Sequence, residues 1–159
     1  MLVFLDTEFT DSLDCDLISI GMVTEDGLLE LYEERADYRA EWCNQFVHAA
    51  VLPQLGKASP ALDRAQLSTR LGEWFATLPQ PVTVACDSFM DWELLLDALD
   101  GVCPANLTGR CALRSLSDSA AFHHAVVSYH EQTGPWHHAL HDARAHRQGW
   151  LASQQNGLA

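Results

Sequence analysis

Basic side chains are scarce in this chain. Of its 159 residues only 9 are lysine or arginine, against 22 aspartates and glutamates, so the formal net charge is −13. A protein that coats nucleic acid carries a basic face over much of its surface, and this composition excludes that class. It does not exclude an enzyme that holds one nucleic-acid end through metal ions, because a bound cation inverts the local charge.

Closely spaced cysteines are also missing. The five cysteines form an odd set without any C-x-x-C pair: Cys15, Cys43, Cys86, Cys103 and Cys111. A disulfide framework needs an even set, and a zinc site needs close ligand spacing. We therefore expect free, mostly buried thiols in a reducing compartment.

The chain lacks the signals of export and of membrane insertion. Its N-terminus has no basic region, and Asp6 and Glu8 interrupt the first apolar run, so this run is not a signal peptide. No uncharged run reaches the roughly 18 residues that a membrane helix needs. We expect a soluble, cytoplasmic protein with no membrane partner.

No internal repeat and no low-complexity segment divides the chain. Hydrophobic residues make up 48% of it, which is typical of a globular protein with a sizeable core. We expect a single domain over residues 1–152 and a frayed C-terminal tail over residues 153–159.

Apolar and β-branched segments predict a sheet that begins with three strands, at Leu2–Phe9, Leu17–Thr24 and Leu28–Glu34. The Glu25-Asp26-Gly27 segment supplies hairpin turn chemistry, so this start is antiparallel. A later apolar run, Val82–Cys86, is typical of a buried parallel strand.

Helices are predicted by apolar spacing and by the position of prolines. We expect them at Trp42–Val51 with Pro53 as the stop, from Ser59-Pro60 to Leu78, at Asp91–Leu99, from Ser117 to about Glu131, and at His138–Leu151. The predicted fold class is α/β: a mixed sheet with an antiparallel start and later parallel strands, flanked by helices.

The first chemical motif is Asp6-Thr7-Glu8, within the first strand. Side chains alternate along a strand, so Asp6 and Glu8 project from one face, about 7 Å apart at the backbone. Two carboxylates on a face used for packing favour a bound cation, because burying unpaired charge is costly. The alternative is a strand end that projects into solvent.

Two further segments carry candidate groups. Asp91 follows the predicted Val82–Cys86 strand, where it is either functional or only an acid favoured at a helix N-terminus. His137 and Asp142 lie at the start of the last helix, where they supply a base near neutral pH and a hard oxygen ligand.

The other histidines of this helix, His138, His141 and His146, are typical of a solvated surface. A zinc site is less favoured, because no H-E-x-x-H is present.

Together these segments resemble the DEDDh-type 3′–5′ exonucleases. That family carries Asp-x-Glu on its first strand, an Asp after a later strand, and His-x-Ala-Leu-x-Asp-Ala near its C-terminus. The matches here are Asp6 and Glu8, then Asp91, then His137 and Asp142, in the family's order. The resemblance spans residues 2 to about 147 and implies a ribonuclease H-like fold.

Within that family the chain is most similar to the RNase AS-like exoribonucleases. The similar stretches are Phe4–Phe9, Leu17–Gly21, Val51–Leu55 and Ala139–Arg144. The chain departs from the pattern in Phe46–Ala50, which is less basic and less polar than the corresponding stretch of those exoribonucleases. It also has Cys86-Asp87 where a His-Asn pair is more common before the middle Asp.

The resemblance implies a two-metal mechanism with Mg²⁺ or Mn²⁺. It assigns metal coordination to Asp6, Glu8, Asp91 and Asp142, with Asp6 shared between the ions, and the general base to His137. Three neighbours of these residues, Thr7, Phe9 and Arg144, are candidates for substrate binding.

The expected activity is release of nucleoside 5′-monophosphates from the 3′ end of single-stranded RNA. Two alternatives stay open: a 3′–5′ deoxyribonuclease of the proofreading type, and a catalytically silent nucleotide-binding or protein-binding module on the same fold. Family members of this size are often homodimers, so a homodimer is also an expectation.

Overall fold

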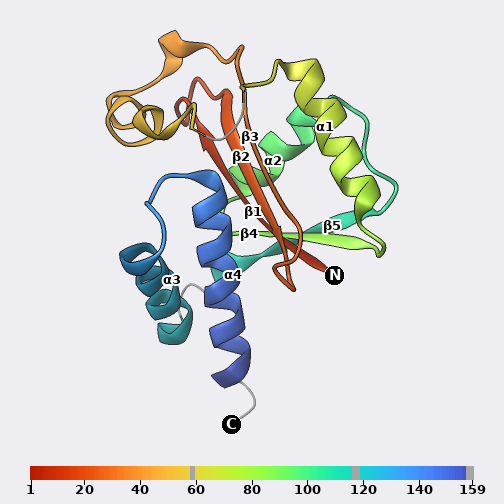
Figure 1. Ribbon diagram of the computed structural model, residues 1–159, viewed down its shortest axis with the longest axis vertical. Coiled ribbons are helices and arrows are strands. Elements are labelled where there is room, and N and C mark those ends of the chain that lie inside the picture. Colours follow the sequence, from red (N-terminus) through yellow and green to blue (C-terminus); the bar gives the residue numbers. More distant parts are fainter. Residues whose placement is uncertain (58–59, 116–118, 157–159) are drawn as a thin grey trace.

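A computed structural model of the protein describes residues 1–57, 60–115 and 119–156. Its centre is a five-stranded mixed sheet in the order β3-β2-β1-β4-β5 (Figure 1). The expected α/β class with a mixed sheet is confirmed. Within the described ranges, no helix is both long and apolar enough to cross a bilayer.

The antiparallel half of the sheet follows the sequence prediction closely. β1 (Leu2–Phe9) pairs with β2 (Leu17–Thr24), and β2 pairs with β3 (Glu30–Glu34). The third strand begins at Glu30 and not at Leu28, because Leu28 and Leu29 belong to the turn segment and are exposed. β1 is therefore central and is bordered by β2 on one side.

The parallel half contains one strand more than predicted. β4 (Val82–Cys86) runs parallel to β1 as expected, and β5 (Leu107–Ala112) runs parallel to β4 at the edge of the sheet. The sequence reasoning missed β5 because this edge strand is mostly exposed and carries no continuous apolar run.

Two predicted helix starts differ from the structure. α1 (Arg64–Thr77) begins after Asp63, whose side chain forms a capping box with Gln66, and Pro60 precedes the helix. α3 (Ala120–Gln132) is capped by Ser119. The predicted starts at Ser59 and Ser117 lie outside the described residues.

The remaining helices deviate mainly in their lengths. α2 covers Phe89–Ala98, and α4 covers Ala139–Asn156. The last helix therefore does not end at Leu151, and residues 153–156 of the predicted tail are helical; residues 157–159 lie outside the described residues.

The prediction of one continuous helix at Trp42–Val51 is wrong. This segment contains a 3₁₀ turn at Ala40–Trp42, a π-helical turn at Val47–Val51 and a second 3₁₀ turn at Leu52–Gln54. Pro53 lies in the first positions of that last turn, where its missing N–H costs nothing, so it does not act as a stop.

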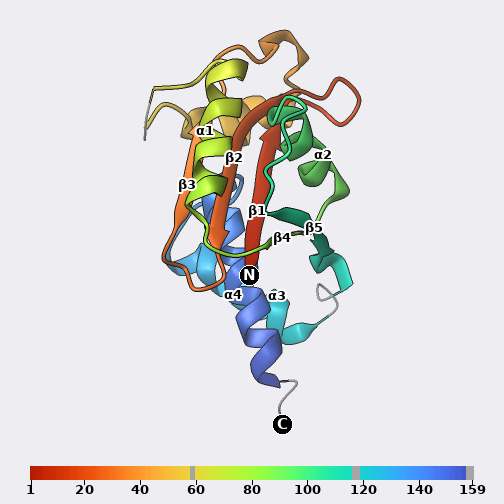
Figure 2. The ribbon, with the colours of Figure 1, turned by 90° about the vertical axis from the view of Figure 1, so that its right-hand side faces the viewer.

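Two apolar layers cover the two faces of the sheet. Val3 and Leu5 of β1 pack with side chains of α1 and α2, whereas Phe4 packs with Ala143 and Trp150 of α4. α3 lies against α4, away from α1 and α2 (Figure 1), and the turned view shows α4 extending past the sheet toward the C-terminus (Figure 2). Odd-numbered side chains of β1 thus face α1 and α2, and even-numbered ones face α4.

The start of α4 touches the backbone of β2 at Gly21. A Cβ atom added to Gly21 would lie 2.2 Å from the Leu140 nitrogen and 2.3 Å from the Ala139 carbonyl carbon. Gly21 is also the antiparallel partner of Asp6. A side chain here would push the first turn of α4 away from the strand that carries Asp6.

We expect Gly21→Ala to destabilise the fold by about 1–3 kcal/mol, because the new methyl meets backbone atoms that cannot rotate away. The matched control is Gly72→Ala in α1, where an added Cβ has no heavy atom within 4 Å. This control should be neutral or stabilising, because alanine is the better helix former. Urea unfolding of both variants measures the difference, and equal stabilities would show that α4 is free to shift.

Candidate metal centre

Three carboxylates from distant parts of the chain meet beside the sheet. Asp6 and Glu8 lie on the face of β1 that α4 covers, and Asp142 lies in the first turn of α4. One carboxylate oxygen of each residue lies within 4.8 Å of those of the other two. The structure thus brings together three of the four carboxylates predicted as metal ligands.

Burial and mutual repulsion raise the pKa values of this group. The pKa of Glu8 rises to about 8, chiefly through burial and then through the charges of Asp142 and Asp91. Burial also raises the pKa of Asp142 to about 6, and burial together with the neighbouring carboxylates raises that of Asp6 well above its usual range. A cation would relieve both the burial cost and the repulsion.

Asp142 is held from two sides by nearby groups. The His138 backbone N–H donates to its Oδ2 at 2.8 Å, and the His130 Nε2 lies 3.2 Å from its Oδ1. His130 is buried, and its Nδ1 faces the carbonyl oxygens of Gly134 and Pro135 at 3.1 and 3.2 Å. An N–H at Nδ1 donates to these carbonyls and fixes the ring. Sequence reasoning missed His130, because only the packing of α3 on α4 brings it to Asp142.

Asp91, the fourth predicted ligand, reaches the centre from the other side of β1. Its carboxylate is buried, and Oδ1 accepts a 2.6 Å hydrogen bond from Thr7, which faces α2. Its Oδ2 is buried without a hydrogen-bond partner among the described residues. Burial raises the pKa of Asp91 to about 7. Asp91 is therefore close enough to interact with Asp6 and Glu8 electrostatically, but it belongs to no close trio of ligand atoms in the described chain.

A second trio shares Asp6 with the first. It consists of Asp6, Asp87 and His146, whose ligand atoms again lie within 4.8 Å of one another. Neither Asp87 nor His146 was predicted as a ligand. Strand register accounts for Asp87: parallel pairing of Phe4 with Ala85, continued by two residues, places Asp87 beside Asp6, and no local sequence pattern shows this register.

His137, the predicted general base, lies at the edge of this centre. Its backbone is left-handed, with φ of 61°, immediately before α4, and its ring contacts Phe46 edge-on with 4.7 Å between centroids. The Gln54 side-chain amide donates to its carbonyl oxygen at 2.8 Å. The positive charge of a protonated His137 acts on the pKa of Asp142, lowering it. The neighbouring His138 instead stacks on Tyr32, with 4.4 Å between ring centroids.

The three predicted substrate-binding residues have other contacts. Thr7 is buried and holds Asp91, and Phe9 packs against the core beneath α1 and α2. Arg144 donates from Nε to Glu30 of β3 at 2.8 Å. These contacts give all three residues structural roles in the fold.

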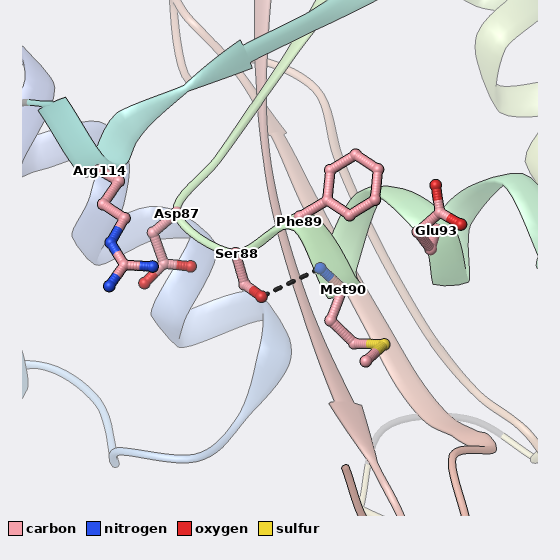
Figure 3. A pocket seen from close by; sticks show the side chains of 6 residues that line it. All are labelled: Asp87, Ser88, Phe89, Met90, Glu93 and Arg114. Atoms are coloured by element: carbon pink, nitrogen blue, oxygen red, sulfur yellow. Dashed lines mark hydrogen bonds between the residues drawn. The ribbon is translucent and has the colours of Figure 1, made fainter. Parts of the chain in front are cut away.

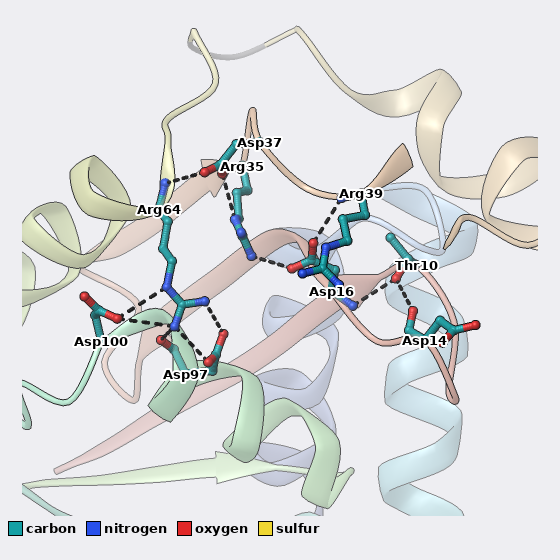
Figure 4. Close-up of polar contacts among 9 residues, drawn as sticks. All are labelled: Thr10, Asp14, Asp16, Arg35, Asp37, Arg39, Arg64, Asp97 and Asp100. Carbon is teal, nitrogen blue, oxygen red and sulfur yellow. Dashed lines mark hydrogen bonds and ion pairs between the residues drawn. The ribbon is translucent and has the colours of Figure 1, made fainter. Parts of the chain in front are cut away.

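Several other arginines are likewise engaged by acids. Arg35 pairs with Asp16 and Asp37, and Arg64 pairs with Asp97 and Asp100 (Figure 4). These pairs join the loops at the end of the sheet to α1 and α2. The scarce basic residues therefore serve largely to hold the scaffold together.

Three exposed aromatic rings belong to residues that neighbour site residues in the sequence or contact them. Phe46 is 53% exposed, Trp136 is 46% exposed and Phe89 is 59% exposed. The Arg110 guanidinium lies over the Phe89 ring, 4.9 Å from its centroid. Phe89 also lines an open pocket that begins at Asp87, with Arg114 pointing toward Asp87 (Figure 3). Rings of this kind offer faces on which planar ligands can stack.

Comparison with protein-family models and with curated proteins finds no match for this chain. The resemblance to DEDDh exonucleases therefore stays a prediction from its motifs. The donor set itself suits a hard divalent cation, because it consists mainly of carboxylate oxygens. The orphaned Oδ2 of Asp91 fits the same group, since a metal-bound water is a ready partner for it.

We expect the metal-free protein to lose stability as the pH rises. Carboxyl groups with raised folded-state pKa values stabilise the fold in their protonated form, fully below about pH 4. This contribution is lost as the pH passes the folded pKa values of about 6 for Asp142, about 7 for Asp91 and about 8 for Glu8. Asp6→Asn should melt at or above the wild type without metal, and its Tm should fall less between pH 5 and about 8.5.

Metal should reverse this loss in the wild type. A cation that binds only the folded chain stabilises it by about 2.7 kcal/mol at one hundred times its dissociation constant. Asp6→Asn should gain much less from Mn²⁺, whereas Asp14→Asn, at an exposed loop position, should behave as the wild type. Melting curves with and without Mn²⁺ measure both effects. Collapse of Asp6→Asn, together with an unchanged wild-type Tm on adding Mn²⁺, would make these acids structural.

Proposed function

We propose that the protein is a metal-dependent phosphodiester hydrolase with a ribonuclease H-like fold, acting as a 3′–5′ exonuclease on single-stranded RNA. The observation that carries this proposal is the meeting of Asp6, Glu8 and Asp142 within 4.8 Å. These are the residues that the resemblance assigns to metal binding. The order β3-β2-β1-β4-β5, with an antiparallel half and a parallel half, supports the fold assignment.

Two divalent ions suit phosphodiester hydrolysis, since they lower the pKa of bound water and stabilise the leaving oxygen. Asp6, Glu8 and Asp142 would bind such ions, with Asp6 in the shared position. Asp91 would orient a water through its orphaned Oδ2, while Thr7 fixes the other oxygen. The core that buries these groups also limits the access of bulk water.

His137 is the group best placed to take a proton from an attacking water. It lies at the rim of the carboxylate cluster, only partly buried, and close enough to influence Asp142 electrostatically. Histidine titrates near neutral pH, as a general base requires. The left-handed backbone at His137 turns the chain into α4, so that the base and Asp142 occupy neighbouring positions.

The exposed aromatic residues near the site favour a single-stranded nucleic acid over a duplex. The rings of Phe46, Trp136 and Phe89 are partly exposed, with one face of Trp136 stacked on His130, and unstacked bases bind exposed rings with little regard to sequence. A chain with a net charge of −13 has no extended basic surface to follow a duplex. We therefore assign binding to a short 3′ end, where metal ions supply the positive charge.

We expect release of nucleoside 5′-monophosphates from the 3′ end of 5′-labelled single-stranded RNA with Mn²⁺ or Mg²⁺. The reaction should stop in excess EDTA, and Glu8→Gln should reduce it strongly because one ligand of the carboxylate trio is weakened. A labelled DNA strand of the same sequence tests whether the protein prefers ribose or deoxyribose in its substrate. Faster cleavage of DNA would favour the deoxyribonuclease alternative, and internal cleavage or activity in EDTA would contradict the proposal. Nucleotide binding without turnover would favour the silent module.

The two adjacent histidines should differ in their effect on turnover. His137→Ala should lower kcat by roughly 10²-fold, the usual scale for a lost general base. His138→Ala should keep kcat near the wild-type value, because only the His138 backbone N–H holds Asp142 and the substitution leaves it in place. Steady-state kinetics on a short RNA measures both variants. A large loss of kcat in His138→Ala and a small one in His137→Ala would assign the general base to His138.

A further inference from the structure

We propose that Asp6, Asp87 and His146 form a second metal-binding position with a mixed oxygen and nitrogen donor set. It takes a divalent transition-metal ion, such as Mn²⁺, Co²⁺ or Zn²⁺. Asp87 and His146 stand outside the ligand set that the sequence motifs predict. The inference deepens the proposed function through the shared Asp6, and its test measures metal binding alone.

Three elements converge to place these side chains. β1 and β4 run in parallel register, Val3 with Val84 and Phe4 with Ala85, so Asp87, directly after β4, lies at the level of Asp6. His146 follows Asp142 by one turn of α4, and residues four apart project from the same helix face. Asp142 therefore completes the first trio and His146 the second, with Asp6 between them.

The imidazole of His146 has no hydrogen-bond partner to account for its position. Its Nδ1 is buried without a partner among the described residues, and its Nε2 lies 3.7 Å from the Asp87 Oδ2. That separation is longer than a hydrogen bond. The ring is held by packing instead, nearly parallel to Phe122 with 6.3 Å between centroids. With its hydrogen on Nδ1, the ring keeps the Nε2 lone pair on the side of Asp87, where a metal ion can accept it.

The Asp87 end of this trio is open to solvent. The Asp87 side chain is 48% exposed, whereas that of His146 is 12% exposed. Asp87 lies at the mouth of the pocket lined by Ser88, Phe89 and Arg114 (Figure 3). An ion held there keeps open positions toward this pocket, where an anionic group such as a phosphate can complete its coordination.

The donor set predicts which metals this position prefers. Imidazole nitrogen suits Zn²⁺, and a mixed site binds Co²⁺ more tightly than Mn²⁺, whereas Mg²⁺ and Ca²⁺ favour an all-oxygen environment. The trio of Asp6, Glu8 and Asp142 offers oxygen only and accepts Mg²⁺ as well as Mn²⁺. The chain should therefore bind two Mn²⁺ ions, and the mixed position should prefer Zn²⁺ and Co²⁺ to Mn²⁺ and bind Mg²⁺ most weakly.

Electron spin echo spectroscopy of the Mn²⁺-loaded protein tests the nitrogen ligand directly. We expect ¹⁴N modulation from imidazole in the wild type and its loss in His146→Gln. Modulation should persist in His137→Ala, which removes the histidine at the edge of the carboxylate cluster, and in His123→Gln, at an exposed position on α3. Circular dichroism confirms that each variant is folded.

Titration calorimetry with Mn²⁺ tests the stoichiometry. We expect two ions per wild-type chain, and in His146→Gln and Asp87→Asn a second site that is about 10-fold weaker or more. Asp87→Asn keeps the test valid if His146→Gln does not fold, because Asp87 is half exposed. An unchanged second site in both variants would overturn the inference, as would the absence of ¹⁴N modulation in the wild type.

These outcomes are separable from those of the proposed function. Loss of nuclease activity with retained ¹⁴N modulation would leave the mixed metal position standing. Nuclease activity with two bound Mn²⁺ ions and no nitrogen ligand would overturn this inference alone.

Discussion

The direct contact of α4 with the β2 backbone is the constraint on which the rest of the structure depends. Gly21 permits this contact, and the partner of Gly21 across the sheet is Asp6. The contact brings the Asp142 and His146 side of α4 against the even-numbered side chains of β1. A side chain at this position would push the start of α4 away from β2, so close packing at one glycine helps to position the acids of the centre.

The acids of the centre and those of the periphery are held in different ways. At the periphery, arginines satisfy carboxylates, as Arg64 does for Asp97. In the centre, neutral donors hold them: the His138 backbone N–H for Asp142 and the Thr7 hydroxyl for Asp91. Such donors fix orientation without cancelling charge. The fold thus keeps a concentrated negative charge at one location. A cation site requires such a charge, and the charge destabilises the folded protein when no cation is bound.

Sequence reasoning found what local patterns encode. Alternation along Leu2–Phe9 placed Asp6 and Glu8 on one face, and motif spacing singled out Asp142. It missed Leu107–Ala112, because an exposed edge strand has no apolar period to detect. It also missed His130 and His146 as partners of carboxylates, since helix packing and strand register, which no local pattern carries, bring them into place. Asp6, Glu8 and Asp142 were therefore predictable as a group, whereas Asp87, His130 and His146 were not.

The engagement of arginines in scaffold ion pairs has a kinetic consequence. With Arg35, Arg64 and Arg144 bound to acids and a net charge of −13, the field around the protein repels a polyanion at long range. Dissolved ions shorten the reach of that repulsion to about 10 Å at 0.1 M. The encounter with the proposed RNA substrate should therefore accelerate with ionic strength, opposite to the usual behaviour of nucleic-acid-binding proteins, and long strands should be slowed more than short ones.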